Sequence, residues 1–114
     1  MNLPDPIDAS AELFRLRHRA RLTQRQIALA TGVKPGVVTG WLRGTRRPRG
    51  ERADRLLLLA ACVEELSRYL SPRDVAAWLA RPLPLDEATP LALIAAGEVR
   101  RMALEIAAAC QRAS

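Results

Sequence analysis

Apolar residues recur every three to four positions along most of the chain, which is the spacing of one face of an α-helix. Seven segments carry this period, and turn or capping signals separate them. We expect helices over residues 9–21, 23–31, 35–43, 52–70, 72–81, 91–96 and 98–112. No stretch is typical of a strand, so the pattern predicts an all-α fold.

The second and third segments have sharp ends. Thr23 and Gln26 form the T-x-x-Q pattern of a capping box, in which each residue satisfies a backbone N–H of the other. Gly32 is expected to stop this helix in the left-handed conformation, and Pro35 suits the first turn of the next one. Gly44 then ends the third helix, and a basic loop containing Pro48 follows. Two short helices joined by a tight turn are therefore predicted.

This spacing is that of a helix-turn-helix, in which the second helix enters the DNA major groove and the first supports it. Ala28 is small where the helices approach each other, Gly32 makes the turn, and Val38 and Trp41 anchor the second helix. Residues 22–44 resemble the Cro/Xre family of repressors. The resemblance implies DNA binding by the first half of the chain.

The charge distribution agrees with that division. The 114 residues carry a formal charge of +6, and residues 1–55 hold 12 Lys and Arg against 5 Asp and Glu, whereas residues 56–114 hold 6 against 7. A basic half joined to a near-neutral half indicates a module that binds a polyanion and a module with another task. We expect a DNA-binding domain at 1–50, a connecting or dimerisation helix at 51–70, and a partner-binding domain at 71–114.

The residues expected to contact double-stranded DNA lie at the start of the second helix, on the recognition helix and in the loop after it: Thr23, Gln24, Arg25, Lys34, Gly36, Thr39, Gly40, Arg43, Arg46, Arg47 and Arg49. The arginines predict a salt-dependent affinity. Direct base readout is expected from Lys34 and Thr39 alone, because glycine has no side-chain donor or acceptor. Gly36 and Gly40 indicate either a bare helix face that lets the backbone approach DNA or a loss of base recognition.

The second half contains Trp78-Leu79, Arg81-Pro82, Thr89-Pro90-Leu91, Leu93-Ile94 and Gly97, followed by a last helix with Val99 and Leu104. This order resembles the C-terminal toxin-binding domain of the Xre/MbcA/ParS antitoxin family, and the junction over residues 41–50 is similar as well. The resemblance implies that the partner is a RES-domain toxin that acts on NAD, that the antitoxin covers the entrance to the toxin's active site, and that it represses its own operon. The residues that it implies for toxin binding are Trp78, Leu79, Arg81, Pro82, Leu91, Ile94, Gly97, Arg100 and Arg101.

Other chemistry is not expected. No Ser or Cys has a base near it in sequence, so no catalytic residues are predicted and the chain is not expected to be an enzyme. Cys62 and Cys110 lie in apolar helical sequence and lack the spacing of a metal site, so neither a metal nor a cofactor is expected. The longest apolar run, residues 56–63, is too short to span a membrane, and Asn2, Pro4, Asp5 and Asp8 are atypical of a signal peptide. A cytoplasmic location is expected.

Three hypotheses remain open at this point. The first is an antitoxin that binds operator DNA and a toxin, as a homodimer or a toxin–antitoxin hetero-oligomer. The second is a free-standing Cro-like dimeric transcription regulator, in which Trp78 and its neighbours form the core of a dimerisation domain. The third is a protein-interaction module with weakened DNA binding.

Overall fold

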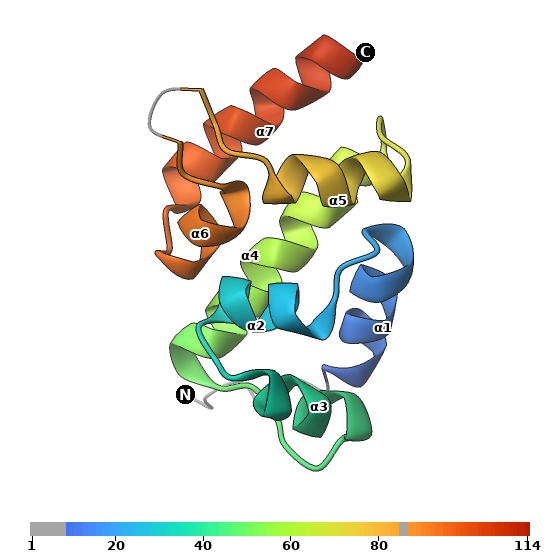
Figure 1. Ribbon diagram of the computed structural model, residues 1–114, viewed down its shortest axis with the longest axis vertical. Coiled ribbons are helices and arrows are strands. Elements are labelled where there is room, and N and C mark those ends of the chain that lie inside the picture. The colour runs from blue at the N-terminus through green and yellow to red at the C-terminus, as the bar shows by residue number, and fades with distance from the viewer. Residues whose placement is uncertain (1–8, 85–86) are drawn as a thin grey trace, which may run out of the picture.

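The described part of the chain folds into a bundle of seven helices, whose arrangement is drawn in Figure 1. The structure is a computed structural model that describes residues 9–84 and 87–114, so the expectations drawn from Asn2, Pro4, Asp5 and Asp8 lie outside the described residues. The helices are α1 (Ser10–Arg19), α2 (Gln24–Thr31), α3 (Pro35–Arg43), α4 (Gly50–Ser67), α5 (Pro72–Ala80), α6 (Pro90–Ala95) and α7 (Val99–Ala113). No strand occurs among these residues, and the all-α prediction is confirmed.

The helix ends follow the local signals. The Thr23 hydroxyl accepts a hydrogen bond from the Gln26 backbone N–H at 3.1 Å, and the Gln26 side chain accepts one from the Thr23 N–H at 2.9 Å, so the capping box is present. Gly32 and Gly44 both adopt φ near 75° and close α2 and α3. Helix α4 ends at Ser67, three residues earlier than expected, and tighter turns follow it, in which the N–H groups of Arg68 and Tyr69 donate to carbonyl oxygens three residues back.

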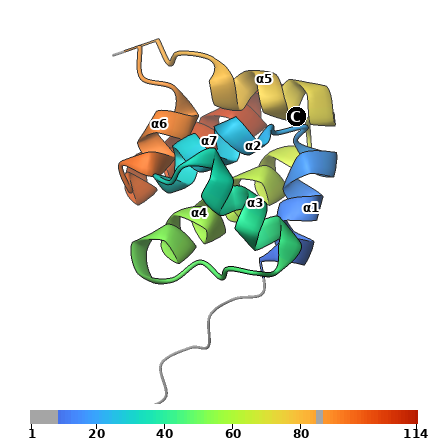
Figure 2. The ribbon, with the colours of Figure 1, turned by 60° about the horizontal axis from the view of Figure 1, so that its bottom comes forward.

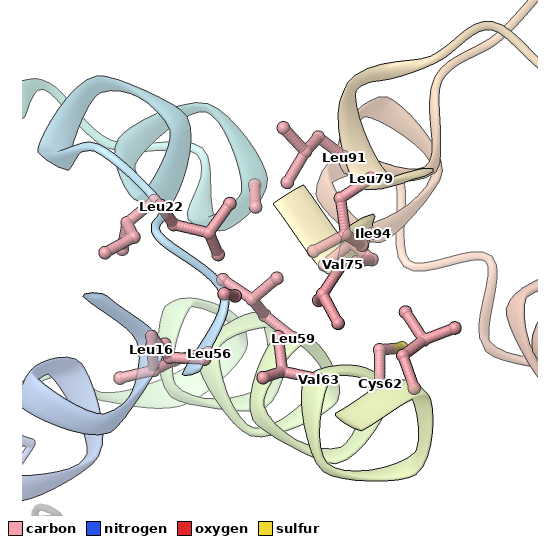
Figure 3. Close-up of a cluster of buried hydrophobic side chains, with 14 of the residues drawn as sticks. Leu16, Leu22, Leu56, Leu59, Cys62, Val63, Val75, Leu79, Leu91 and Ile94 are labelled. Atoms are coloured by element: carbon pink, nitrogen blue, oxygen red, sulfur yellow. The ribbon is translucent and has the colours of Figure 1, made fainter. Parts of the chain in front are cut away.

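A single buried cluster joins both halves of the chain. Figure 3 shows Leu16 of α1 and Leu22 facing Leu59 of α4, with Val75 of α5 and Ile94 of α6 on the other side of the same cluster. Helix α4 packs against α1, α2, α5, α6 and α7, and α2 also packs directly on α6. The divisions expected at residues 50 and 70 therefore do not coincide with a break in the core and stay a proposal about function.

Helix α3 lies at the end of the molecule away from α5 and α7 (Figures 1 and 2). Its hold on the core comes from Trp41 and Val38, which are 2% and 0% exposed. The basic loop of residues 44–49 runs from α3 to α4 on the same side (Figure 2). The recognition helix and this loop thus form one continuous outer surface. No described helix is both long enough and apolar enough to cross a membrane.

Candidate nucleic-acid interface and partner surface

A hydrogen bond ties the start of α2 to the recognition helix α3. Gln24 Nε2 donates to Thr39 Oγ1 at 2.9 Å, and Thr39 Oγ1 donates in turn to the Pro35 carbonyl oxygen at 3.3 Å. Two of the side chains expected to contact DNA are therefore held together before any ligand arrives. Because the Thr39 hydroxyl is already engaged, a base would have to share it or displace one of these bonds.

A basic hollow of about 570 Å³ surrounds the N-terminus of α2. Arg17, Arg21 and Arg25 line it together with Gln24 and Pro35. The free N–H groups of the first helical turn favour an anion at this place, and the arginines add positive charge. Sequence reasoning selected Arg25 but missed Arg17 and Arg21, because α1 ends at Arg19 and the three arginines do not lie on one helix.

A second hollow, of about 480 Å³, lies at the C-terminal end of α3. It contains the expected residues Arg46, Arg47 and Arg49, and it adds Arg52, which sequence reasoning did not select. Trp41 and the buried Pro48 form its apolar wall. Lys34 and Arg43 are exposed at the two ends of α3, and Thr23 is occupied by its capping box.

No ion pair within residues 9–84 and 87–114 neutralises these cations. The two ion pairs found among the described residues join Arg15 to Glu12 and Arg68 to Glu65, and neither involves an arginine of the two hollows. Both hollows lie beside α3, one at the junction with α2 and the other in the loop that leaves it. This arrangement presents unpaired positive charge on both sides of the recognition helix, which suits a phosphate backbone.

The two glycines of α3 have different surroundings. Gly36 is exposed, and an added Cβ would meet no atom within 4 Å. Gly40 is buried, because the Arg46 side chain lies across it. The expected bare helix face is therefore present at Gly36, and the expectation is corrected at Gly40, where an arginine stem covers the backbone.

Three of the residues expected to bind a partner belong to the core. Leu79, Leu91 and Ile94 are 0%, 3% and 0% exposed. The structure corrects their expected role, since a partner seated on the folded surface does not reach them. An apolar side chain suits a core and an interface equally, so residue type alone could not separate the two.

The other residues expected to bind a partner lie on two separate parts of the surface. Arg81 and Pro82 are exposed after α5, and Arg100 is exposed at the start of α7. Trp78 and Arg101 are half-buried. Helices α5 and α7 do not contact each other within the described residues, and both pack on α6. The five side chains thus come from α5 and the two residues after it, and from α7, which does not contact α5.

Gly97 has a structural task at the turn between α6 and α7. Its φ is 74°, and an added Cβ would lie 2.6 Å from Nη2 of Arg55. Arg55 Nε donates to the carbonyl oxygen of Ala95 at 3.3 Å, so this α4 side chain caps the end of α6. A side chain at position 97 would displace that cap, which accounts for the glycine without a partner.

An apolar groove of about 350 Å³ runs between α4 and α7, and sequence reasoning missed it. Its lining comes from both helices and the turn after α4: Leu58, Ala61, Cys62, Glu65, Tyr69, Met102, Ala103, Ile106, Ala107 and Cys110.

Burial raises the pKa of the Cys62 thiol to about 12, and burial, with a smaller contribution from Glu65, also raises the pKa of Cys110. Both thiols are therefore poor nucleophiles. No group of metal-ligating side chains forms in the described part of the chain.

Residues 13–59 match the family model for a helix-turn-helix domain. This segment is a helix-turn-helix domain. It runs from Leu13 in α1 to Leu59 in α4 and so includes α2, α3 and the basic loop. The helix-turn-helix prediction is confirmed, and the matched domain extends past the boundary expected at residue 50.

The whole chain also resembles a protein of known structure. It is similar to the MbcA antitoxin in the crystal structure of the M. tuberculosis MbcT–MbcA toxin–antitoxin complex, with a TM-score of 0.76 and 23% sequence identity. The likeness covers 92% of this chain and 96% of that chain. At this identity it shows a shared fold. No curated protein matches the chain in sequence.

The helix-turn-helix domain and the remaining helices thus carry different surfaces. The domain presents two basic hollows beside an exposed recognition helix. The second half presents an apolar groove beside α7 and scattered arginines. The first arrangement suits a polyanion, and the second suits a protein.

Proposed function

We propose that this protein is the antitoxin of a type II toxin–antitoxin system. In this proposal residues 13–59 bind operator DNA and repress the chain's own operon, while the second half binds and neutralises the toxin. The fold likeness to MbcA carries the proposal, because it extends over 92% of the chain and so includes both halves. The family resemblance of residues 78–104 supports a RES-domain toxin that degrades NAD.

The DNA-binding part of the proposal is supported by the unpaired arginines around α3. Its test is the double variant Arg46→Ala/Arg47→Ala, studied by fluorescence anisotropy with a duplex from upstream of the chain's own gene. Each lost phosphate contact lowers the slope of log affinity against log salt by about 0.9, so we expect the slope to fall by roughly 1 to 2.

The matched control is Arg73→Ala/Arg112→Ala. It removes the same charge from exposed positions on α5 and α7, away from both hollows. We expect its slope to stay within experimental error of the parent protein. Equal slopes for the two double variants would remove Arg46 and Arg47 from the interface, and no binding by the parent protein would refute DNA binding.

The toxin-binding part is tested by co-expression with the product of the neighbouring open reading frame. We expect that product to stop growth and deplete NAD when expressed alone, to be harmless beside this chain, and to co-purify with it. Arg81→Glu and Arg100→Glu are tested separately, because α5 and α7 do not contact each other. Loss of co-purification in one of them identifies the contacting helix. A neighbour that is harmless on its own would refute the antitoxin assignment.

The groove between α4 and α7 favours a second candidate, a free-standing Cro-like regulator whose second half dimerises. In this case the protein binds DNA as a dimer and needs no partner from the neighbouring gene. Light scattering of the purified chain, together with the co-expression result, distinguishes the two candidates. A dimer with a non-toxic neighbour supports the regulator, and a toxic neighbour that co-purifies supports the antitoxin.

A further inference from the structure

The Arg46 side chain lies flat against the recognition helix. A Cβ added at Gly40 would lie 2.9 Å from Cδ, 3.0 Å from Cγ and 3.2 Å from Cβ of Arg46. Three successive carbons of the arginine therefore pass over the glycine at distances that a side chain at position 40 would prevent. Gly40 is buried for this reason, although it lies in the middle of a surface helix.

The backbone at Arg46 is also fastened to this glycine. The Gly40 carbonyl oxygen accepts hydrogen bonds from the N–H groups of Thr45 and Arg46, at 3.0 and 3.2 Å, and from the Thr45 hydroxyl at 3.2 Å. Gly44 turns the chain with φ near 75° so that these donors face back to α3. One residue thus anchors both the main chain and the side-chain stem of Arg46.

The guanidinium group at the end of this stem remains available. Arg46 is exposed, and its side chain takes part in no ion pair or hydrogen bond within residues 9–84 and 87–114. The helix itself offers few donors here, since Gly36 and Gly40 have no side chains. A stem that is already held in place loses less conformational freedom on binding than a free arginine.

We propose that Gly40 is a positioning residue that holds Arg46 against α3, so that this loop arginine contacts DNA as a member of the recognition-helix surface. The inference rests on the proposed DNA binding and deepens it. It also gives the glycine a reason to be there, because glycine is less favourable than alanine inside a helix. Filling the space over Gly40 that the Arg46 side chain occupies should therefore weaken DNA binding without lowering the stability of the fold.

The test combines Gly40→Ala with Arg46→Ala in a double-mutant cycle, with affinity measured by anisotropy on the labelled upstream duplex. The atoms nearest to the alanine methyl group are side-chain carbons of the exposed Arg46, so the variant is expected to fold. We expect Gly40→Ala to weaken binding roughly 3- to 10-fold, the effect of freeing one long side chain. The Arg46→Ala background lacks Cγ and Cδ and keeps only the Cβ at 3.2 Å, so Gly40→Ala should then have a much smaller effect.

Gly36→Ala is the matched control, because it makes the same change one turn earlier in open space. Its effect on affinity should be the same with and without Arg46. The melting temperature of Gly40→Ala should equal or exceed that of the parent protein. An equal loss of affinity from Gly40→Ala in both backgrounds, or no loss in the parent background, would overturn the inference while leaving DNA binding intact. Absence of binding by the parent protein would overturn the proposed function, and this inference with it.

Discussion

Replacing Ile94 with alanine should destabilise the helix-turn-helix domain, although Ile94 lies outside it. Ile94 is 0% exposed and shares one buried cluster with Leu16, Leu22 and Leu59. The substitution removes three buried carbons, worth about 0.8 kcal/mol each, and leaves a cavity that adds to the loss. We expect the free energy of unfolding to fall by about 3 kcal/mol, within the measured range for such changes.

The two tryptophans allow each half to be followed separately. Trp41 is 2% exposed in α3, and Trp78 is half-buried in α5. Urea unfolding is measured by fluorescence in a Trp78→Phe parent and in a Trp41→Phe parent, each with and without Ile94→Ala. With a slope of about 2 kcal/mol per molar urea, the midpoint should fall by roughly 1.5 M for both reporters.

The control for this experiment is Leu104→Ala on α7. Leu104 is 73% exposed, so the change should alter stability by no more than about 0.5 kcal/mol. A midpoint that falls for Trp78 and stays constant for Trp41 would refute the reasoning. It would mean that the two halves unfold independently despite their common buried cluster.

Two further predictions concern Gly97 and the cysteines. Gly97→Ala should lower the free energy of unfolding by about 1 kcal/mol more than Gly32→Ala. Both glycines have φ near 75°, but only Gly97 lies under the Arg55 guanidinium. Equal melting temperatures for the two variants would contradict this. Iodoacetamide should modify Cys110 before Cys62, as measured by mass spectrometry of tryptic peptides. Since burial raises the pKa of Cys62 from 9.0 to about 12, its contribution to stability should be lost as the pH rises from 9.0 toward 12, and a Cys62→Ala variant should lack this loss.

Local signals in the sequence were enough to predict which segments are helical and where α2 and α3 begin or end. Thr23 with Gln26 determined where α2 begins, and Gly32 and Gly44 determined where α2 and α3 end. These signals act between residues at most a few positions apart, because a helix end needs only a nearby side chain or a left-handed turn. The helix-turn-helix followed from the same signals together with the periodic apolar residues, and the family match confirms it.

Tertiary contacts decided which side chains lie together on the surface beside α3. Arg17 and Arg25 share a hollow because α1 ends beside the start of α2, and Arg46 covers Gly40 because the loop after α3 folds back on it. Sequence position could not show either arrangement, since the exposure of a side chain depends on which segments pack together.

The same reason applies to Leu91 and Ile94. The sequence was enough to place these apolar residues on one short helix, and their role there was expected to be partner binding. Only the packing of α6 on α2 and α4 decided that they complete the core of the helix-turn-helix half rather than face a partner. Burial removes apolar area from water whether the covering surface belongs to the same chain or to another, so residue type carries no information about which one it is.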